Sequence, residues 1–252
     1  MNLPPRGSRA KMAAMASFGQ FCPVAVACEV FAERWTPIIV RELLNGSHRF
    51  NEIHRCIPLI SRPLLVRRLR DLEAAGVIRS TVPEKGKPRE YHLTESGREF
   101  RAAIEALGTW GQRWTVRVQP DNLDSGLLMW NIRRRVALDK LPERRVVVHF
   151  EVRGVPTSRS MLKKCWLILE RSGCDVCLSD PGYEVEIWVD ADLGSMARVW
   201  LGDLPFQQAL REKKVRVAGT PALVRQFPDW LLLSHFAAVP RPPSVSPAAR
   251  TA

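Results

Sequence analysis

Apolar side chains recur at helical spacing across residues 61–75 of the chain. Leu65, Leu69 and Leu72 fall at positions i, i+4 and i+7, a pattern typical of a helix that buries one face in a core. The serine that opens this stretch can cap the helix through its hydroxyl group, and Gly76 supplies a left-handed stop. The pattern therefore predicts an amphipathic helix over 61–75.

Three helical stretches precede this helix, and two β-type runs follow it. Because a basic loop, Glu84–Arg89, joins the runs Val77–Val82 and Glu90–Leu93, the sequence predicts a small hairpin. The next helical pattern, Glu95–Gln112, has an apolar face with no partner in so small a domain, which predicts a helix that pairs with a second chain. The three preceding helices are predicted over Val24–Glu33, Pro37–Asn45 and Asn51–Cys56.

A second group of elements follows Trp114–Ser125, which we interpret as a linker. Several β-type runs are flanked there by helical stretches, which predicts an α+β domain with a small sheet flanked by helices. The predicted helices are Leu127–Leu138, Leu193–Leu201, Phe206–Arg211 and Pro221–Phe227. The predicted strands are Val146–Val152, Cys165–Glu170, Val176–Ser179, Glu184–Asp190 and Val215–Ala218.

The charge of the chain indicates a polyanionic partner. The 252 residues carry a formal net charge of +12, although the 25% of charged residues is ordinary for a globular protein. The first 120 residues hold half of the 38 basic side chains but only 11 of the 26 acidic ones, so the surplus lies mainly with the predicted hairpin. Such a surplus favours binding to nucleic acid, with release of its counterions.

The sequence offers no sign of a membrane or secretory destination. No apolar run approaches the roughly 20 residues that span a bilayer, and no secretory signal pattern opens the chain. Six cysteines in so long a chain indicate reduced thiols rather than a disulfide framework. We therefore expect a cytoplasmic protein without a membrane partner.

A basic helix followed at once by a basic hairpin is the layout of a winged helix-turn-helix. That layout places one helix in a DNA groove and the hairpin loop, the wing (83–89), over the phosphates. Arg67 and Arg70 fall roughly opposite the leucine stripe, because each residue turns a helix by about 100°. A solvated helix face can also carry such arginines, but the adjoining basic wing favours DNA. The predicted DNA-binding residues are Arg49, Ser61, Arg62, Arg67, Arg68, Arg70, Lys85, Lys87 and Arg89.

Residues 22–111 resemble a known family through a dispersed set of motifs. The set includes Cys22-Pro23-Val24, Arg34-Trp35, Arg49-Phe50-Asn51-Glu52-Ile53, Gly76-Val77-Ile78-Arg79 and Trp110-Gly111. On these residues the segment resembles the HxlR-type winged-helix transcription regulators, a bacterial and archaeal family. The resemblance implies a homodimer, joined through its first and last helices, that binds a two-fold-related operator. Pro63 and Leu65 depart from the more polar residues common in that family.

The cysteines leave two interpretations open. Cys22 precedes Pro23 at a helix start, where the positive end of the helix dipole favours the thiolate. The resemblance adds that some family members use this cysteine as a redox sensor. The favoured alternative is a structural cysteine packed at the dimer interface. Cys174 and Cys177 form a lone CxxC, and we interpret them as strand residues because a zinc site needs four ligands.

Motifs of catalytic chemistry are missing from the sequence. It contains no phosphate-binding glycine loop, no GxSxG and no pair of histidines at metal-ligand spacing. Asp190 and Asp192 end a predicted strand, and we expect them to cap the following helix rather than to catalyse a reaction. We therefore expect neither an enzyme nor a bound metal or cofactor.

The second domain resembles the sterol-carrier-protein-2-like (SCP2-like) fold. The trace runs through Glu184–Val189, Val199–Gly202, Phe206–Ala209 and Val215–Gly219. The resemblance implies a small sheet and helices around an apolar tunnel for lipid-like molecules. The alternative is that the same side chains fill a solid core, as apolar stripes usually do. The predicted pocket residues are Ile187, Val189, Val199, Trp200, Phe206, Val217 and Trp230.

Together these features predict a dimeric transcription regulator that binds double-stranded DNA sequence-specifically and responds to an apolar ligand. The rival interpretation is a lipid-binding or lipid-carrying protein whose winged helix serves dimerisation or protein contact. The predicted organisation is a flexible arm (1–17), a winged-helix domain (18–114), a linker (115–126), a ligand-sensing domain (127–239) and a disordered tail (240–252).

Overall fold

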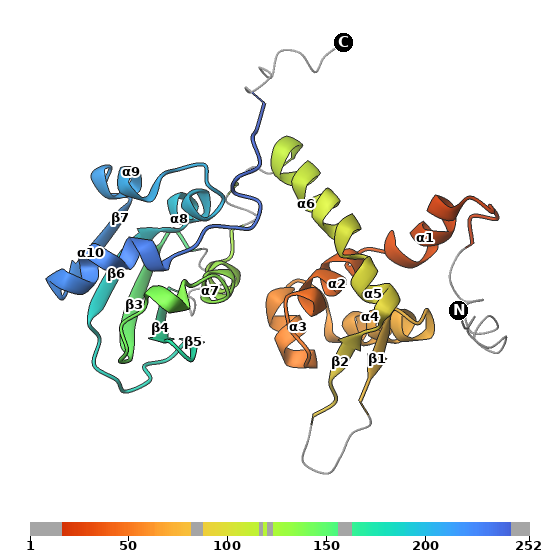
Figure 1. Cartoon of the computed structure of the whole chain (residues 1–252), viewed down its shortest axis with the longest axis horizontal. Coiled ribbons are helices and arrows are strands. Elements are labelled where there is room, and N and C mark those ends of the chain that lie inside the picture. The colour runs from red at the N-terminus through yellow and green to blue at the C-terminus, as the bar shows by residue number, and fades with distance from the viewer. Residues whose placement is uncertain (1–16, 82–87, 116–117, 120–122, 156–162, 243–252) are drawn as a thin grey trace. The chain divides into compact units, whose positions relative to one another are not determined.

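The protein forms two compact units, Met1–Leu107 and Gly108–Ala252 (Figure 1). A computed structural model describes residues 17–81, 88–115, 118–119, 123–155 and 163–242. Most of the predicted arm and most of the predicted tail lie outside these described residues. The limits predicted for the domains and the linker stay predictions.

The N-terminal unit consists of helices and one short hairpin. Its elements are α1 (Pro23–Phe31), α2 (Thr36–Leu44), α3 (Phe50–Cys56), α4 (Arg62–Ala74), β1 (Ile78–Ser80), β2 (Tyr91–Leu93), α5 (Glu95–Glu99) and α6 (Arg101–Trp114), the last of which continues into the second unit. The predicted helices and hairpin strands before α5 are confirmed to within a few residues.

The long helix predicted over Glu95–Gln112 is wrong in one respect, because it is divided into α5 and α6 at Phe100. The ring of Phe100 lies flat on the ring of Phe31, with 3.4 Å between the two ring centroids. The amide of Ile104 still donates to the carbonyl of Phe100 at 3.1 Å, so the interruption is local. A contact with a residue about seventy positions earlier thus coincides with the break, and helical periodicity carries no sign of it.

Helix α4 is held in the unit by its leucine stripe. Leu65, Leu69 and Leu72 are almost completely buried, which confirms the predicted core face. The Oγ of Ser61 accepts the amide of Leu64 at 3.4 Å, so the predicted cap is also confirmed. Gly76 follows the helix with a φ of 73°, a left-handed conformation that glycine adopts without steric cost.

The hairpin that follows α4 has two different faces. Strands β1 and β2 pair antiparallel, with Ile78 opposite Leu93 and Arg79 opposite His92. Ile78 and Leu93 are buried, whereas Arg79 on the other face is exposed. Because side chains alternate along a strand, this register places Arg79 and His92 together on the face away from the buried pair.

The C-terminal unit is an α+β domain, as predicted. Its strands are β3 (Val146–Arg153), β4 (Lys164–Glu170), β5 (Gly173–Cys177), β6 (Ile187–Asp192) and β7 (Val215–Gly219). They form one sheet in the order β5-β4-β3-β6-β7, in which β3 and β6 are parallel and the other neighbours are antiparallel. The helices are α7 (Ser125–Arg133), α8 (Leu193–Trp200), α9 (Phe206–Arg211) and α10 (Pro221–Trp230), together with a short 3-10 helix, η4 (Leu138–Lys140).

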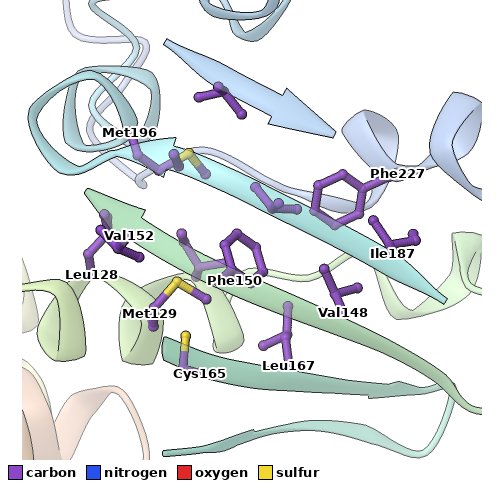
Figure 2. Close-up of a cluster of buried hydrophobic side chains, with 14 of the residues drawn as sticks. Leu128, Met129, Val148, Phe150, Val152, Cys165, Leu167, Ile187, Met196 and Phe227 are labelled. Atoms are coloured by element: carbon purple, nitrogen blue, oxygen red, sulfur yellow. The ribbon is translucent and has the colours of Figure 1, made fainter. Parts of the chain in front are cut away.

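One face of the sheet packs against helices in a continuous apolar core (Figure 2). Val148 and Phe150 of β3 point into it beside Leu167 of β4 and Ile187 of β6, and α10 adds Phe227. These side chains are completely or almost completely buried, so the sheet and helices form a closely packed layer pair.

The helix predicted over Leu127–Leu138 is wrong at its C-terminal end, since α7 stops at Arg133. Beyond it, Val136 forms a β-bridge with Leu231, and the amide of Ala137 donates to the carbonyl of Trp230 at 2.9 Å. These bonds use backbone groups that a longer helix would have paired internally. The long-range pairing with the end of α10 therefore replaces the last helical turn.

Candidate nucleic-acid interface

Helix α4 presents two cations, Arg67 and Arg70, on the side opposite its buried leucines, and both are exposed. Arg62, in the first turn, is exposed as well but lies at the flank of the leucine stripe. No carboxylate pairs with Arg67 or Arg70 within the described part of the chain. Guanidinium groups held this way can donate to guanine edges or to phosphate oxygens.

Arg62 lies at the junction of α3 and α4. Its Nη1 donates to the Oδ1 of Asn51 at 3.2 Å, and its guanidinium lies 5.7 Å from the centre of the Phe50 ring. Asn51 is exposed beside it, at the start of α3. Asn51 is not among the DNA-binding residues predicted from the sequence, although an amide next to a cation can add a hydrogen bond to DNA.

Arg68 has a different environment from its neighbours on α4. Its guanidinium donates to the carboxylate of Glu33, to Asp71 at 3.2 Å and to the backbone carbonyl of Arg34 at 3.3 Å. Only 12% of its side chain is exposed. These contacts fix α4 to the segment between α1 and α2, so we leave Arg68 out of the candidate interface.

Arg49 connects the start of α3 to the hairpin. Its Nε donates to the Oε1 of Glu90 at 3.2 Å, and the two residues also form a β-bridge. The hydrogen bond from Arg49 is the main cause that lowers the pKa of Glu90, so this carboxyl group stays ionised as the partner of Arg49. About half of the Arg49 side chain remains exposed, at 53%, and can still reach a phosphate.

The predicted wing is described only in part. Arg89 is exposed at the start of the returning strand. Lys85 and Lys87 lie outside the described residues, so their predicted contacts with phosphates stay predictions. The described cations of the candidate interface are therefore Arg49, Arg62, Arg67, Arg70 and Arg89.

Cys22 is exposed at the position that precedes helix α1. The backbone N–H groups of Ala25 and Val24, in the first turn, lower the pKa of its thiol by hydrogen bonding to the thiolate. The environment of this cysteine in a single chain therefore favours reactivity. Its predicted redox role and the alternative of a structural cysteine at a dimer interface both stay predictions.

The apolar residues predicted to line a ligand pocket lie mainly in the core of the C-terminal unit. Ile187, Val189, Val199 and Trp230 are buried in the packed cluster. The remaining three, Trp200, Phe206 and Val217, are partly buried against it. A small cavity of about 30 Å³ is lined by Val199, Trp200 and Phe206 among others, which is room for little more than one water molecule.

A larger cavity of about 290 Å³ in the same unit involves mostly different residues. Leu123, Leu127, Leu193 and Trp200 are among its lining side chains, and of the seven predicted pocket residues it includes Trp200 alone. Its volume lies near the lower end of the range for small-molecule pockets, roughly 300–1,000 Å³.

The cysteine pair and the acidic pair of the C-terminal unit have structural roles. Cys174 and Cys177 lie in β5, as predicted, and burial raises the pKa of Cys174 to about 12. Asp192 caps α8 by accepting the amide of Ser195 at 2.8 Å, as predicted, whereas Asp190 pairs with Arg153 instead.

The described residues contain neither a cluster of metal ligands nor a candidate membrane span. Among them no three histidine, cysteine or acidic side chains are grouped closely enough to hold a metal ion. In the same part of the chain, no helix combines the length and the apolar character that crossing a membrane requires.

Helices α2, α3 and α4, followed by the β1–β2 hairpin, define a winged helix-turn-helix domain. The family model "HxlR-like helix-turn-helix" matches residues 30–119. The HTH-type transcriptional regulator YvaP of Bacillus subtilis is 36% identical over 107 residues, which are 42% of this chain and 96% of the relative. The chain therefore belongs to the HxlR-like helix-turn-helix family through its N-terminal part.

Other relatives match a similar share of the chain. An HTH-type transcriptional regulator of Methanothermobacter thermautotrophicus is 38% identical over 94 residues, 37% of this chain and 72% of the relative. Among solved structures, the reduced form of the transcriptional regulator YodB from Bacillus subtilis is 31% identical and covers 38% of this chain and 96% of its own, with a TM-score of 0.34. The C-terminal unit beyond residue 119 lies outside the family model.

Proposed function

We propose that the protein is a transcription regulator that binds double-stranded DNA sequence-specifically, with α4 in the major groove and the wing over the phosphates. The observation that carries this proposal is the two-sided character of α4. Its leucines are buried, while Arg67 and Arg70 are exposed on the other side, where they can meet base edges. Relatives that bear the name of HTH-type transcriptional regulators add support.

The cations around α4 divide into two groups by what they can contact. Arg67 and Arg70 project from the helix itself, where side chains of a recognition helix read bases. Arg49 and Arg89 lie at the start of α3 and at the wing, where cations usually grip phosphates and set the register on the duplex. Both groups together supply affinity, and the first group supplies the sequence preference.

We further propose that two copies associate through α1 and α6. Val24 and Val26 on α1 are 70% and 44% exposed, and Leu107 and Trp110 on α6 are 55% and 59% exposed. Two helices with such apolar faces are unusual on a monomer and typical of a surface that another chain covers. A homodimer would present two α4 helices to a two-fold-related operator.

The C-terminal unit is proposed to act as a sensor for an apolar ligand. The support is the small sheet flanked by helices, in keeping with an SCP2-like fold, and the cavity of about 290 Å³ beside Leu127 and Trp200. Mass spectrometry of the purified protein under native conditions would detect a co-purifying apolar molecule. A ligand-free protein that binds no fatty acid would argue against a sensor of this kind.

The DNA-binding proposal is tested by gel shifts with genomic fragments at two salt concentrations. We expect a subset of fragments to bind, with affinity that falls steeply with salt because phosphate contacts release counterions. Arg67→Ala with Arg70→Ala should abolish the preference among fragments. Arg211→Ala, which removes an exposed arginine of the C-terminal unit, is the matched control. A protein that shifts no fragment at low salt would favour the rival, a lipid carrier.

A further inference from the structure

The N-terminal unit contains a cavity of about 250 Å³ beside the base of the wing, away from the α4 arginines discussed above. Its polar lining comes from three places in the chain. His48 precedes α3, Arg79 and His92 are partners across the β1–β2 ladder, and Arg98 and Arg101 belong to α5 and α6. None of the eight described residues that line the cavity is acidic. Its charge therefore favours an anion.

The guanidinium groups in this cavity have hydrogen-bond donors to spare. Arg98 uses one N–H group, from Nη1 to the carbonyl of Leu93 at 2.9 Å. Arg101 meets Glu105 only at 4.0 Å, with both side chains about half exposed, so the pair is weak. Arg79 is exposed, and its guanidinium makes no hydrogen bond or ion pair within the described part of the chain. Each guanidinium carries five N–H donors, so all three can bind an anion.

The rest of the cavity lining consists of leucines and the two imidazole rings. Leu43 and Leu44, at the end of α2, form one wall together with Leu93. The rings of His48 and His92 stack with 4.6 Å between their centroids and form another surface. Nδ1 of His48 lies 3.1 Å from the carbonyl oxygen of Tyr91, which holds this ring in place. Leu43 and Leu93 are already buried, but Leu44 and both imidazole rings are partly exposed. A bare phosphate would leave these surfaces open to water, whereas the apolar part of an organic anion would cover them.

We propose that this cavity binds a small organic anion, a carboxylate or phosphate attached to a flat apolar body. The charged group would lie among Arg79, Arg98 and Arg101, and the apolar body would lie against the leucines and the stacked imidazole rings. Guanidinium and carboxylate form paired, charge-assisted hydrogen bonds, and these give such a site its selectivity for anions.

The position of the cavity gives the anion a regulatory consequence, which rests on the proposed DNA-binding function. An anion that binds all three arginines would link the wing strands to the start of α6. His48 is the neighbour of Arg49, which ties α3 to the wing through Glu90. If the anion and DNA prefer different positions of the hairpin, the anion lowers DNA affinity by the same factor by which DNA lowers the affinity for the anion.

The binding claim is tested on the full-length protein without DNA, by calorimetric titration with 2-naphthoate. The neutral isostere 2-naphthamide is the control ligand. We expect naphthoate to bind at least about tenfold more tightly than naphthamide, since only the carboxylate can form charge-assisted bonds. Arg79→Gln and Arg101→Gln should each lower the naphthoate affinity about tenfold and leave naphthamide unchanged. Arg211→Gln should change neither.

Three results would overturn the site: no binding of naphthoate, equal affinity for the two ligands, or an affinity that Arg79→Gln and Arg101→Gln do not change. If the same variants instead weaken duplex binding and its salt dependence, the arginines are DNA-phosphate contacts, and the proposal is wrong. Gel shifts with and without naphthoate then separate the two proposals. Naphthoate binding to a protein that shifts no DNA fragment would refute the DNA-binding function and leave the site standing.

Discussion

Two neighbouring arginines on α4 have opposite environments and should respond differently to the same substitution. Arg68→Ala removes contacts with Glu33, Asp71 and the carbonyl of Arg34, so we expect the free energy of unfolding to fall by about 1–2 kcal/mol. Arg67→Ala should change it by less than about 0.5 kcal/mol, because the side chain is exposed. Urea denaturation of the two variants measures the difference. Equal stabilities would contradict the assigned role of Arg68.

The thiol of Cys22 should be the most reactive at neutral pH among the described cysteines. Backbone N–H groups lower its pKa, so its thiolate fraction rises at a lower pH than that of an ordinary cysteine. Burial raises the pKa of Cys165 and of Cys174 to about 12, so these thiols stay protonated through neutral pH. Alkylation by iodoacetamide, followed residue by residue with mass spectrometry from pH 6 to 9, should modify Cys22 first. If the pH midpoint of Cys22 alkylation lies at or above the ordinary pKa of a cysteine thiol, this account is contradicted.

At the scale of single residues, the sequence identifies which arginines of α4 face outward, but it does not show which of them is paired with a carboxylate. Helical periodicity places Arg67 and Arg70 opposite the leucines, and both are exposed. Arg68 lies at the flank of the buried stripe, and its partner Glu33 comes from a segment 35 positions earlier. Such a contact depends on how the segment between α1 and α2 packs on α4, and local periodicity contains no information about it.

At the scale of elements, α5 packs so closely on Val77, which precedes β1, and on β2 that only glycine fits at one position. A Cβ atom on Gly97 would lie 2.2 Å from the backbone carbonyl oxygen of Val77 and 2.9 Å from Cδ2 of Leu93. Since backbone must move to relieve the first contact, Gly97→Ala should destabilise the domain by about 1–3 kcal/mol. Thermal unfolding followed by circular dichroism measures this, with Gly111→Ala, which meets only one side-chain atom at 3.7 Å, as the control. A melting temperature lowered equally by both changes would contradict the close packing.

The proposed association of two copies through α1 and α6 leads to a second prediction at the scale of elements. Leu107→Glu introduces a charge into the exposed apolar face of α6, which should convert the dimer to a monomer in light scattering. Leu178→Glu changes a side chain of similar exposure, 52%, in the C-terminal unit, and should leave the dimer intact. A wild-type protein that is monomeric at micromolar concentration would refute the pairing.

Most elements could be predicted from local pattern, and the exceptions have a common cause. Caps and stops such as Ser61 and Gly76 mark α4 because they act on the adjacent backbone. The break at Phe100 and the early end of α7 coincide with contacts with Phe31 and Trp230, which lie far away in the sequence. The sheet order β5-β4-β3-β6-β7 likewise could not be read from the strands, because nothing in their alternation specifies which neighbours they take.

At the scale of the whole molecule, the two units combine a recognisable DNA-binding domain with a domain that the family model does not cover. The ligand pocket predicted for the second domain stays a prediction. Periodicity locates buried residues such as Ile187 and Val189 correctly but cannot distinguish the wall of a cavity from the interior of a packed core. The cavity of about 290 Å³ in this domain is lined both by buried residues, such as Leu128 and Leu193, and by partly exposed ones, such as Leu127 and Trp200.

The central claim is that α4 binds DNA through its exposed arginines, and the preference for a selected fragment over an unrelated one tests it most directly. Fluorescence anisotropy gives the Kd of the fragment selected by gel shift and of an unrelated fragment of equal length, for the wild type and for Arg67→Ala with Arg70→Ala. Each lost base contact costs about 1–3 kcal/mol of discrimination, so the double variant should lose most of its preference. Its slope of log K against log salt should stay close to that of the wild type, because Arg49 and Arg89 still contact phosphates. An unchanged preference in the double variant, with Arg211→Ala as the control, would contradict the claim.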